Sequence, residues 1–109
     1  MADHLGPFEQ AALIAIFRLG EDAYGLAVLT DVQQRLGRPV AAGAIHTTLE
    51  RLERKKLVAS RLGSGTPVRG GRARRFYRLQ PRGVEALNHA RRTMERVWRG
   101  LQWPLKSTT

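Results

Sequence analysis

The chain has 109 residues and no cysteine, which predicts one domain with a small hydrophobic core and excludes disulfides, thiol catalysis and thiolate metal sites. Its longest apolar run covers residues 11–17, far short of the roughly 18 residues that a membrane-spanning helix needs. The formal net charge is +10, and no charged segment leads into an apolar one as in a signal peptide. We therefore expect a cytoplasmic protein with an anionic partner and no membrane association.

The positive charge is concentrated after residue 40. Residues 1–40 contain three Arg and five acidic residues, a net charge of −2, whereas residues 41–109 contain sixteen Lys or Arg and four acidic residues, a net charge of +12. Arginine dominates over lysine, and its planar guanidinium group matches phosphates and the edge of guanine. A basic surface that serves only solubility is the alternative, although mixed charges would serve that purpose better. The asymmetry favours a nucleic-acid partner.

The first predicted helix begins at Pro7, which suits the first helical position because an N–H group is not needed there. Gly20 fits the C-terminal cap of this helix. Apolar residues between these two positions, among them Phe8 and Ala12, cover nearly all sides of the helix. Such a helix should be buried, and we expect a second chain to cover part of it.

A second helix is predicted over residues 23–36, with Asp22 as its N-terminal cap. Gly37 and Pro39 should end it. The residues expected on its inner side are Leu29, Val32 and Leu36.

The third predicted helix covers residues 43–56 and follows a short turn. Its apolar residues Ile45, Leu49 and Leu52 are spaced i, i+4 and i+7, which places them on one face. Ala41 is the expected N-cap, although alanine is a poor capping residue. Two helices joined by a tight glycine-containing turn, the second of them basic, predict a helix-turn-helix.

A basic β-hairpin should follow the third helix. Residues 57–62 and 72–79 are the predicted strands, and the glycine-rich stretch between them supplies the turn. A basic helix suits the major groove of DNA, and a narrow β-loop can lie along the phosphate backbone or in the minor groove. The helix and the hairpin together predict a surface that binds DNA.

The last predicted helix begins at Pro81 and runs to about residue 101. It contains a series with the 3-4 spacing of a coiled-coil seam: Val84, Leu87, Arg91, Met94, Trp98 and Leu101. A seam of this kind on so small a domain predicts pairing with a second copy, and the alternative is a stripe that packs on the same domain. Pro104 should stop the helix and leave residues 104–109 as a flexible tail.

This order of elements predicts a mainly α fold with a small β-hairpin, a winged helix-turn-helix followed by a C-terminal dimerisation helix. The sequence resembles the PadR family of transcriptional regulators in residues 13–19, 24–26, 43–53, 56–58 and 70–79 and in Gly83. We divide the chain into a DNA-binding domain over residues 1–80, a dimerisation helix over residues 81–103 and a tail over residues 104–109.

The resemblance implies a homodimeric transcriptional repressor, with a small-molecule effector in some relatives. The two-fold symmetry of such a dimer predicts a near-palindromic DNA operator and hence sequence-specific binding. His46 stands where the family usually has Tyr, which bears on base preference, and Gln80 stands where it usually has Thr, which predicts a frayed start of the last helix. The alternative function is a less specific nucleic-acid-binding or protein-docking module. No catalytic constellation and no cluster of metal ligands is recognisable, so we expect no enzyme, no cofactor and no metal.

The candidate site residues fall into three groups. The expected DNA contacts are Gly43, His46, Thr47, Arg51, Arg54, Arg69, Arg72, Arg74 and Arg75. The expected dimerisation residues are Phe8, Ala12, Val84, Leu87, Arg91, Met94, Trp98 and Leu101. Trp98 and Trp103 are also candidates for stacking on a flat effector, although interface core is the favoured role for Trp98.

Three alternatives remain open for residues of the third helix. Gly43 could be an ordinary helix-start glycine, and His46 could be a partly buried histidine bonded to its own helix. Glu50 and Glu53 could form ion pairs along the helix with Arg54 and with the two lysines that follow it.

Overall fold

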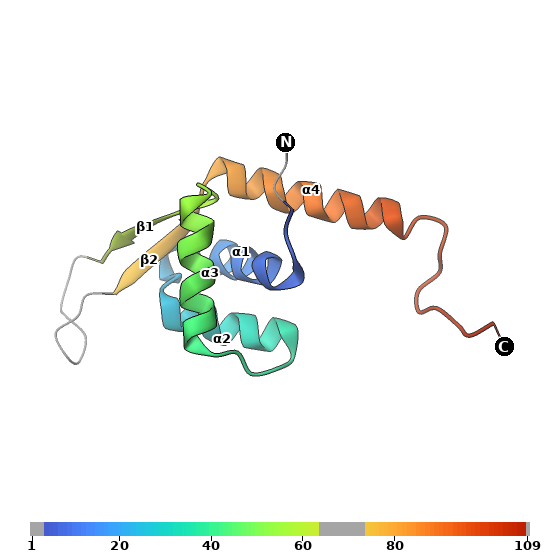
Figure 1. The fold of residues 1–109 in the computed structure, drawn as a ribbon, viewed down its shortest axis with the longest axis horizontal. Helices are drawn as coiled ribbons and strands as arrows, with labels where there is room; N and C mark the ends of the chain where they lie inside the picture. Colours follow the sequence, from blue (N-terminus) through green and yellow to red (C-terminus); the bar gives the residue numbers. More distant parts are fainter. Residues whose placement is uncertain (1–3, 64–73, 109) are drawn as a thin grey trace.

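The computed structural model describes residues 4–63 and 74–108 (Figure 1). Its elements are α1 (Pro7–Leu19), the short 3-10 helix η1 (Gly20–Asp22), α2 (Gly25–Leu36), α3 (Ala42–Arg54), β1 (Val58–Leu62), β2 (Arg75–Leu79) and α4 (Pro81–Val97). The predicted fold class is confirmed: three helices, a hairpin and a C-terminal helix form a winged helix-turn-helix.

Helix α1 lies at the centre of the fold and packs against α2, α3, β2 and α4. Gly20 closes it with a φ of 58°, a conformation that glycine adopts easily. From α2, Val28 and Val32 complete this side of the core, whereas Leu29 and Leu36 are only partly buried. The residues of α1 that are buried are Ala11, Ala12, Leu13, Ala15 and Ile16.

Helix α2 begins later than the sequence predicts. Asp22 lies in η1, and Tyr24 is the N-cap of α2. The reason is a strand-like contact: Tyr24 forms a β-bridge with Phe76, and the N–H of Tyr77 donates to the carbonyl oxygen of Ala23 at 2.8 Å. These bonds hold the backbone extended immediately before the helix, so the predicted cap at Asp22 is wrong.

The turn between α2 and α3 is fixed by its own backbone and one side chain. Gly37 ends α2 in the left-handed region with a φ of 68°. The N–H of Val40 donates to the side-chain oxygen of Gln33 at 3.0 Å. Ala41 is the N-cap of α3 as predicted, without a side-chain cap, and α3 ends at Arg54, two residues earlier than predicted.

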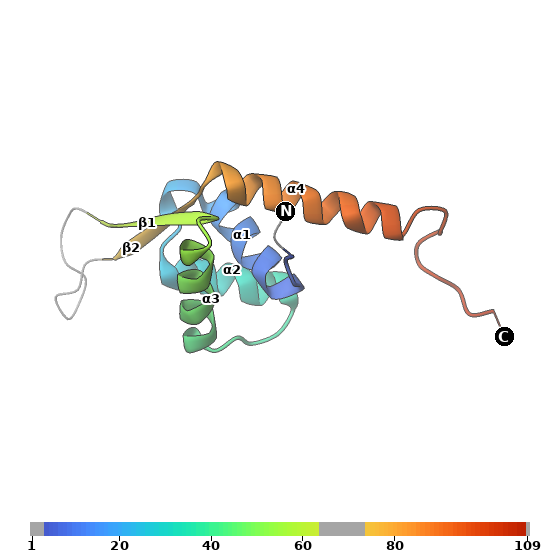
Figure 2. The same cartoon turned by 45° about the horizontal axis from the view of Figure 1, so that its top comes forward.

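The hairpin is antiparallel, with Val58 opposite Leu79 and Leu62 opposite Arg75. Residues 64–73, which connect its strands, lie outside the described ranges. Strand β1 leads directly from the end of α3, so the hairpin is held next to the C-terminal end of that helix (Figure 2).

The start of α4 is anchored rather than frayed. Gln80 is its N-cap and makes no side-chain capping bond, but its N–H donates to the carbonyl oxygen of Leu57 at 2.9 Å. Gly83 is buried against the same peptide group, and a Cβ at this position would collide with the carbonyl oxygen of Leu57. The expectation of a frayed start is therefore wrong, because backbone contacts replace the missing side-chain cap.

The end of α4 also differs from the prediction. The helix ends at Val97, and Trp98 is its C-cap. Gly100 has a φ of 85°, and the N–H of Leu101 donates to the carbonyl oxygen of Trp98 at 3.1 Å, which is a turn and not a further helical turn. Leu101 is therefore not a seam position of the helix, and the predicted helical extent to about residue 101 is wrong.

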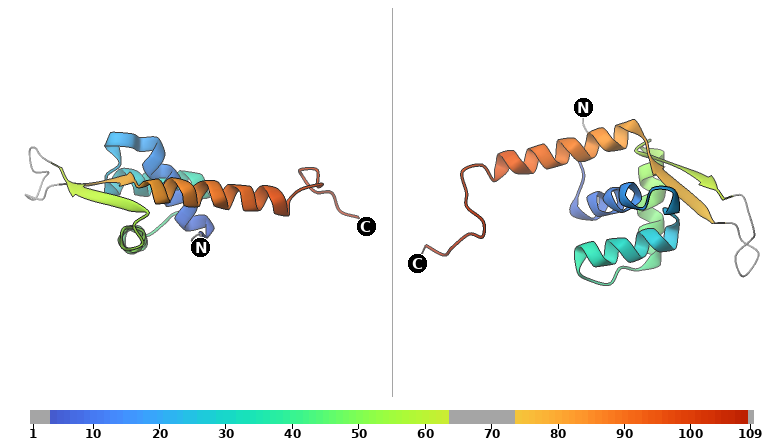
Figure 3. Two further views of the ribbon diagram at one scale, coloured as in Figure 1. Left: turned by 90° about the horizontal axis from the view of Figure 1, so that it is seen from above. Right: turned by 180° about the vertical axis from the view of Figure 1, so that it is seen from behind.

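Helix α4 and the hairpin project from the helical body in opposite directions (Figure 3). The described molecule is accordingly elongated, with extents of 60, 31 and 20 Å. The C-terminal part of α4 and the segment after it run clear of the other elements. No helix in the described ranges is long and apolar enough to cross a membrane.

Candidate nucleic-acid interface

One side of α3 faces away from the core and carries a continuous polar stripe. The opposite side is held in the core by Ile45, Leu49 and Leu52, as predicted. The outward residues recur at helical spacing and form what we call the α3 stripe: Gly43, His46, Thr47, Glu50 and Arg54. Four of these five were expected to contact DNA, and the fifth is a carboxylate.

His46 and Glu50 pair along the α3 stripe, with 3.2 Å between Nε2 and Oε1. Both side chains are more than half exposed, so His46 is not the partly buried histidine of the alternative interpretation. The partner of Glu50 is therefore His46 rather than Arg54. At the helix start, the lack of a side-chain cap leaves the first backbone N–H groups suited to an anion such as phosphate.

Glu9 of α1 holds the basic residues at one edge of the α3 stripe. Its Oε2 lies 3.2 Å from Nε of Arg51 and 3.7 Å from Nζ of Lys55, while its Oε1 accepts a hydrogen bond from the N–H of Gly6. The Glu9 side chain is only 13% exposed, against 41% for Arg51. Arg51 thus lies beside the stripe, tied to α1, and its guanidinium group would approach DNA from the edge.

The other edge of the stripe is joined to the hairpin by a short relay. The hydroxyl of Ser60 in β1 donates to Oε2 of Glu53 at 2.7 Å, and Nη1 of Arg75 in β2 donates to that hydroxyl at 2.9 Å. Glu53 therefore accepts a hydrogen bond from the hairpin, in place of the ion pair along α3 that was considered as an alternative. The relay fixes the angle between hairpin and helix, which sets where both would meet a duplex.

Aromatic rings support the basic residues at the base of the hairpin. Tyr24 and Phe76 pack edge to face with 5.8 Å between ring centroids. The guanidinium carbon of Arg74 lies 4.2 Å from the Tyr24 ring centroid, and that of Arg61 lies 5.1 Å from the Phe76 centroid. These cation–π contacts restrict the rotamers of both arginines while leaving them exposed.

The hairpin contributes more exposed arginines than the sequence prediction included. Arg74 and Arg75 were expected, and the structure adds Arg61 and Arg78. Their alternation along predicted strands was the available signal, because side chains at i and i+2 share a face. Arg69 and Arg72, also expected to contact DNA, lie outside the described residues.

Tyr77 of β2 is buried in the core beneath the hairpin. Burial raises the pKa of its phenol above 10.0, with a smaller opposing effect of Arg75 and small further increases from Glu53 and Glu50. The side chain is 7% exposed, so Tyr77 is a neutral core residue near neutral pH. In the described ranges, no three His, Asp or Glu side chains come together as metal ligands.

A second surface, apolar rather than basic, runs along α1 and α4. Its α4 residues include Val84, Met94 and Trp98, each at least 40% exposed, and from α1 it includes Phe17, which is 68% exposed. Of the other residues predicted to form the dimer interface, Phe8 and Leu87 are partly buried, and Arg91 and Leu101 are exposed. Ala12 is fully buried in the core of its own chain, so its predicted contact with a partner is wrong.

Between α1 and α4 this surface is hollowed into a pocket of about 550 Å³. Its lining residues are Gln10, Ile14, Leu87, Asn88, Arg91, Met94, Glu95 and Trp98. Nε of Arg91 donates to Oε1 of Glu95 at 3.0 Å, so the one charged seam residue is neutralised within its own helix. The contributions of Gln10 and Ile14 were not predicted, although both lie on the helical face of α1 that also carries Phe17.

The two tryptophans expected at this end of the molecule meet each other. The rings of Trp98 and Trp103 pack edge to face, with centroids 5.5 Å apart and an interplanar angle of 71°. Trp98 lines the pocket between α1 and α4, and Trp103 is 77% exposed.

A family model, the transcriptional regulator PadR-like family, matches residues 13–89. The chain belongs to the PadR-like family of transcriptional regulators. The match runs from within α1 through α3 and the hairpin into α4, so the α3 stripe and the hairpin lie within the PadR-like region, whereas Glu9 precedes it. The family consists of regulators and not of enzymes.

The chain is also similar to individual transcriptional regulators. The transcriptional regulator Rv3488 of Mycobacterium tuberculosis is 41% identical over 73 residues, which are 67% of this chain and 64% of that protein, less than two thirds of its length. A PadR family regulator from Eggerthella lenta has a TM-score of 0.66 at 24% identity and covers 86% of this chain and 80% of its own. A PadR-like regulator from Bacillus cereus has a TM-score of 0.64 at 25% identity and covers 82% of each chain.

Proposed function

We propose that this PadR-like protein is a sequence-specific DNA-binding transcriptional repressor that acts as a homodimer on a near-palindromic operator. The observation that carries the proposal is the α3 stripe, an exposed helix face flanked by the arginines of the hairpin and fixed to it by the relay of Glu53, Ser60 and Arg75. A rigid polar helix with a basic hairpin beside it has the shape and charge to enter a major groove while holding the adjacent backbone.

Within the α3 stripe, the residues divide by the chemistry they offer to DNA. His46, Thr47 and Arg54 present side chains that can contact base edges, and Thr47 also suits the methyl group of thymine. Gly43 lets a phosphate approach the start of the helix. Arg51, held by Glu9 at the edge, is placed for the backbone more than for bases.

The dimer proposal rests on the uncovered apolar surface of α1 and α4. The N-terminal half of α4 forms one broad surface with α1, whereas its C-terminal half projects past the helical body and lines a pocket with Gln10 and Ile14 of α1. If two α4 helices pack antiparallel, the projecting half of each covers the broad surface of the other. A parallel pair would join the projecting halves and leave Ile14 and Phe17 in water, which costs apolar burial. We therefore infer an antiparallel dimer, whose two-fold axis makes the operator near-palindromic.

Repression follows from occupancy alone. A dimer that holds two recognition helices about one DNA turn apart, roughly 34 Å, covers enough of a promoter to exclude polymerase. The test is a footprint on upstream DNA of the regulator's own gene, combined with transcription in vitro on the same template. A protected near-palindrome with reduced transcript supports the proposal, and a protected site with increased transcript would show an activator.

The salt dependence of binding separates this function from the alternative of a protein-docking module. If a dimer contacts about eight phosphates, the logarithm of the association constant should fall against the logarithm of salt concentration with a slope near −7. The measurement is duplex affinity across a salt series. A slope flatter than about −2 would contradict a DNA surface, and equal affinity for all duplexes would favour the less specific nucleic-acid-binding module.

The pocket between α1 and α4 favours a small-molecule effector as an addition to this function. Its volume of about 550 Å³ and its lining by Trp98, Met94 and Leu87 suit a flat apolar molecule, with Arg91 and Glu95 at hand for polar groups. Quenching of tryptophan fluorescence by aromatic compounds, followed by operator binding with the same compounds, would test it. An effector should quench the tryptophan fluorescence and also change the affinity for the operator.

A further inference from the structure

An apolar cluster lies beyond the end of α4. We call it the C-terminal wedge and define it by four residues: Trp98, Leu101, Trp103 and Leu105. All four are at least 40% exposed, and Trp103 reaches 77%. The edge-to-face contact between the two indoles gives the wedge a defined shape. Four large apolar side chains within eight residues form an exposed patch of the kind that marks a contact site.

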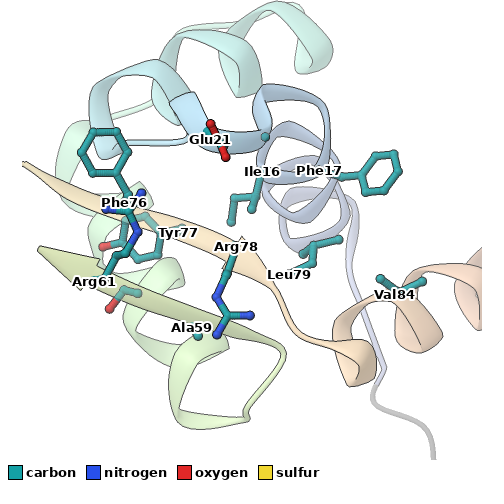
Figure 4. A pocket seen from close by; sticks show the side chains of 12 residues that line it. Ile16, Phe17, Glu21, Ala59, Arg61, Phe76, Tyr77, Arg78, Leu79 and Val84 are labelled. Atoms are coloured by element: carbon teal, nitrogen blue, oxygen red, sulfur yellow. The ribbon is translucent and has the colours of Figure 1, made fainter. Parts of the chain in front are cut away.

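A second uncovered site lies at the other end of α4. It is a groove of about 550 Å³ between the end of α1, the hairpin and the start of α4, and we call it the hairpin groove (Figure 4). Its apolar residues include Phe17, which is 68% exposed, and Val84, which is 40% exposed. Arg61, Arg78 and Glu21 supply its polar part.

The wedge cannot fill the hairpin groove of its own chain as it is placed. The groove adjoins Val84 at the start of α4, and the wedge follows its end (Figures 1 and 4). The 17 residues of α4 separate the two sites by about 25 Å along the helix at 1.5 Å per residue. A second subunit brings them together.

The residue spacing along α4 predicts that the wedge lies next to the hairpin groove of the partner subunit. Arg91 is the middle position of the series from Val84 to Trp98, so if the two-fold axis of the antiparallel dimer passes at Arg91, Val84 lies opposite Trp98 of the partner subunit. Residues after Trp98 then pass the start of the partner's α4, which is where its hairpin groove opens. The wedge therefore continues the proposed dimer interface without a break.

We propose that in the dimer the C-terminal wedge of each subunit occupies the hairpin groove of the other. The proposal rests on the antiparallel dimer proposed above. The chemistry of the two sites matches, because the wedge supplies indole rings and the groove supplies apolar side chains and the guanidinium groups of Arg61 and Arg78, which pack well on indole faces. Lys106, which follows the wedge, complements Glu21 at the groove.

This docking gives the wedge a role at the DNA surface. Phe76, Arg61 and Arg78 of the groove belong to the hairpin. A subunit whose groove is filled has its hairpin supported from the side by the partner, in addition to the contact with Tyr24. The hairpin of one half-site is thus steadied by the subunit bound at the other.

Cysteine cross-linking tests the docking directly, because the natural chain has no thiol. One preparation carries Leu105→Cys in the wedge, and another carries Ala59→Cys in β1, where Ala59 lines the groove. The two are mixed, allowed to exchange subunits and oxidised mildly. We expect a covalent heterodimer on a non-reducing gel. The matched control replaces Ala59→Cys by Gln34→Cys, an exposed position on α2 outside the groove, and should give at least tenfold less product.

A second measurement does not depend on cross-linking. The double variant Trp103→Ala and Leu105→Ala should raise the dimer Kd about 10- to 100-fold, as expected for removing buried aromatic and aliphatic contacts. Gln102→Ala, at an exposed polar position of the same segment, should leave the dimer Kd unchanged. Both are measured by sedimentation of the otherwise intact chain.

The outcomes separate this proposal from the dimer on which it rests. If the natural chain sediments as a monomer at all accessible concentrations, the proposed dimer fails. If it is a dimer but the Ala59 and Gln34 preparations cross-link equally, and the wedge variant keeps the natural Kd, the dimer stands and the wedge docking is overturned. Cross-linking specific to the groove together with a weakened wedge variant establishes it.

Discussion

The two functional surfaces of this molecule differ in how complete they are within one chain. Along α3 and the hairpin, charged side chains already have partners: His46 with Glu50, Arg51 with Glu9, and Arg75 with Ser60. Along α4 and the segment after it, large apolar side chains lie in water. The polar surface is preorganised by contacts inside the chain, whereas we expect the apolar surface to be covered by a second body.

Because of that difference, we expect substitutions on the two surfaces to have different effects on DNA binding and on dimerisation. A change on the preorganised surface should alter affinity for DNA and leave assembly intact, because its supporting contacts are internal. A change on the apolar surface should alter assembly first, and should alter DNA binding through the loss of the dimer, because a monomer meets one half-site at a time. The four experiments that follow test whether the two surfaces can be separated in this way.

The largest effect is expected from removing the seam. Met94→Ala with Trp98→Ala deletes two exposed apolar side chains from the projecting half of α4, and both become interface core in the proposed dimer. We expect a monomer at micromolar concentration and a loss of at least about 100-fold in operator affinity. Sedimentation and operator titration measure the two effects.

The control for this variant is His89→Ala, an exposed position of α4 outside the seam series. It should remain dimeric and bind normally. A double variant that stays dimeric would mean that the subunits meet elsewhere and that the seam packs within one domain.

The next largest effect on DNA binding compares Arg54, within the α3 stripe, with Arg51 at its edge. Arg54→Ala removes an exposed guanidinium group from the stripe and should cost roughly 1–3 kcal/mol of operator binding, with relaxed preference at one base position in each half-site. Arg51→Ala, at the edge and tied to Glu9, should weaken all sequences about equally. Binding to a set of operators with single base changes measures both. The reverse pattern would place Arg51 in the groove, as the sequence alone suggested.

A smaller effect is expected from the relay between α3 and the hairpin. Ser60→Ala removes the hydroxyl that joins Glu53 to Arg75, and each lost hydrogen bond is worth about 1 kcal/mol. We expect operator affinity to fall several-fold while the dimer Kd changes little. Gel-shift titration beside sedimentation checks this, and a Ser60→Thr variant, which keeps the hydroxyl, should recover most of the affinity.

The smallest effect concerns Tyr77 and appears only at alkaline pH. Burial raises the pKa of its phenol in the folded protein, so the folded state favours the protonated form. Its stabilising contribution is fully present below the ordinary pKa of 10.0 and is lost as pH rises through the higher folded value. Denaturant unfolding between pH 9 and pH 11.5 should show this decline, and a Tyr77→Phe variant should show less of it.

Periodic patterns predicted most of this fold. The buried face of α3 was predicted from the spacing of Ile45, Leu49 and Leu52, and the ends of α1 were predicted from Pro7 and Gly20. These predictions succeeded because each depends on residues that are close together in the chain. The errors arose where distant segments meet. Asp22 failed as a cap because β2 pairs with the backbone before α2, a contact that no local pattern contains.

The candidate site shows the same limit. The outward residues of α3 followed from spacing alone, so His46, Thr47 and Arg54 were correctly placed on one face. The partner of Arg51 is 42 residues away in sequence, and spacing could not find it. The segment after Val97 was wrongly continued as helix because the seam series extended to Leu101, although Gly100 within it has a φ of 85°.

The carboxylate of Glu9 has a mechanical consequence for regulation. It accepts a hydrogen bond from the backbone of Gly6 at the start of α1 and pairs with the guanidinium group of Arg51 and the ammonium group of Lys55, so two ion pairs join α1 to one end of α3. Helix α1 carries part of the apolar surface, and α3 carries the stripe. A rotation of one subunit against its partner would therefore swing the stripe with it as part of one stiff block, and would change the distance between two half-sites rather than the bases preferred within each.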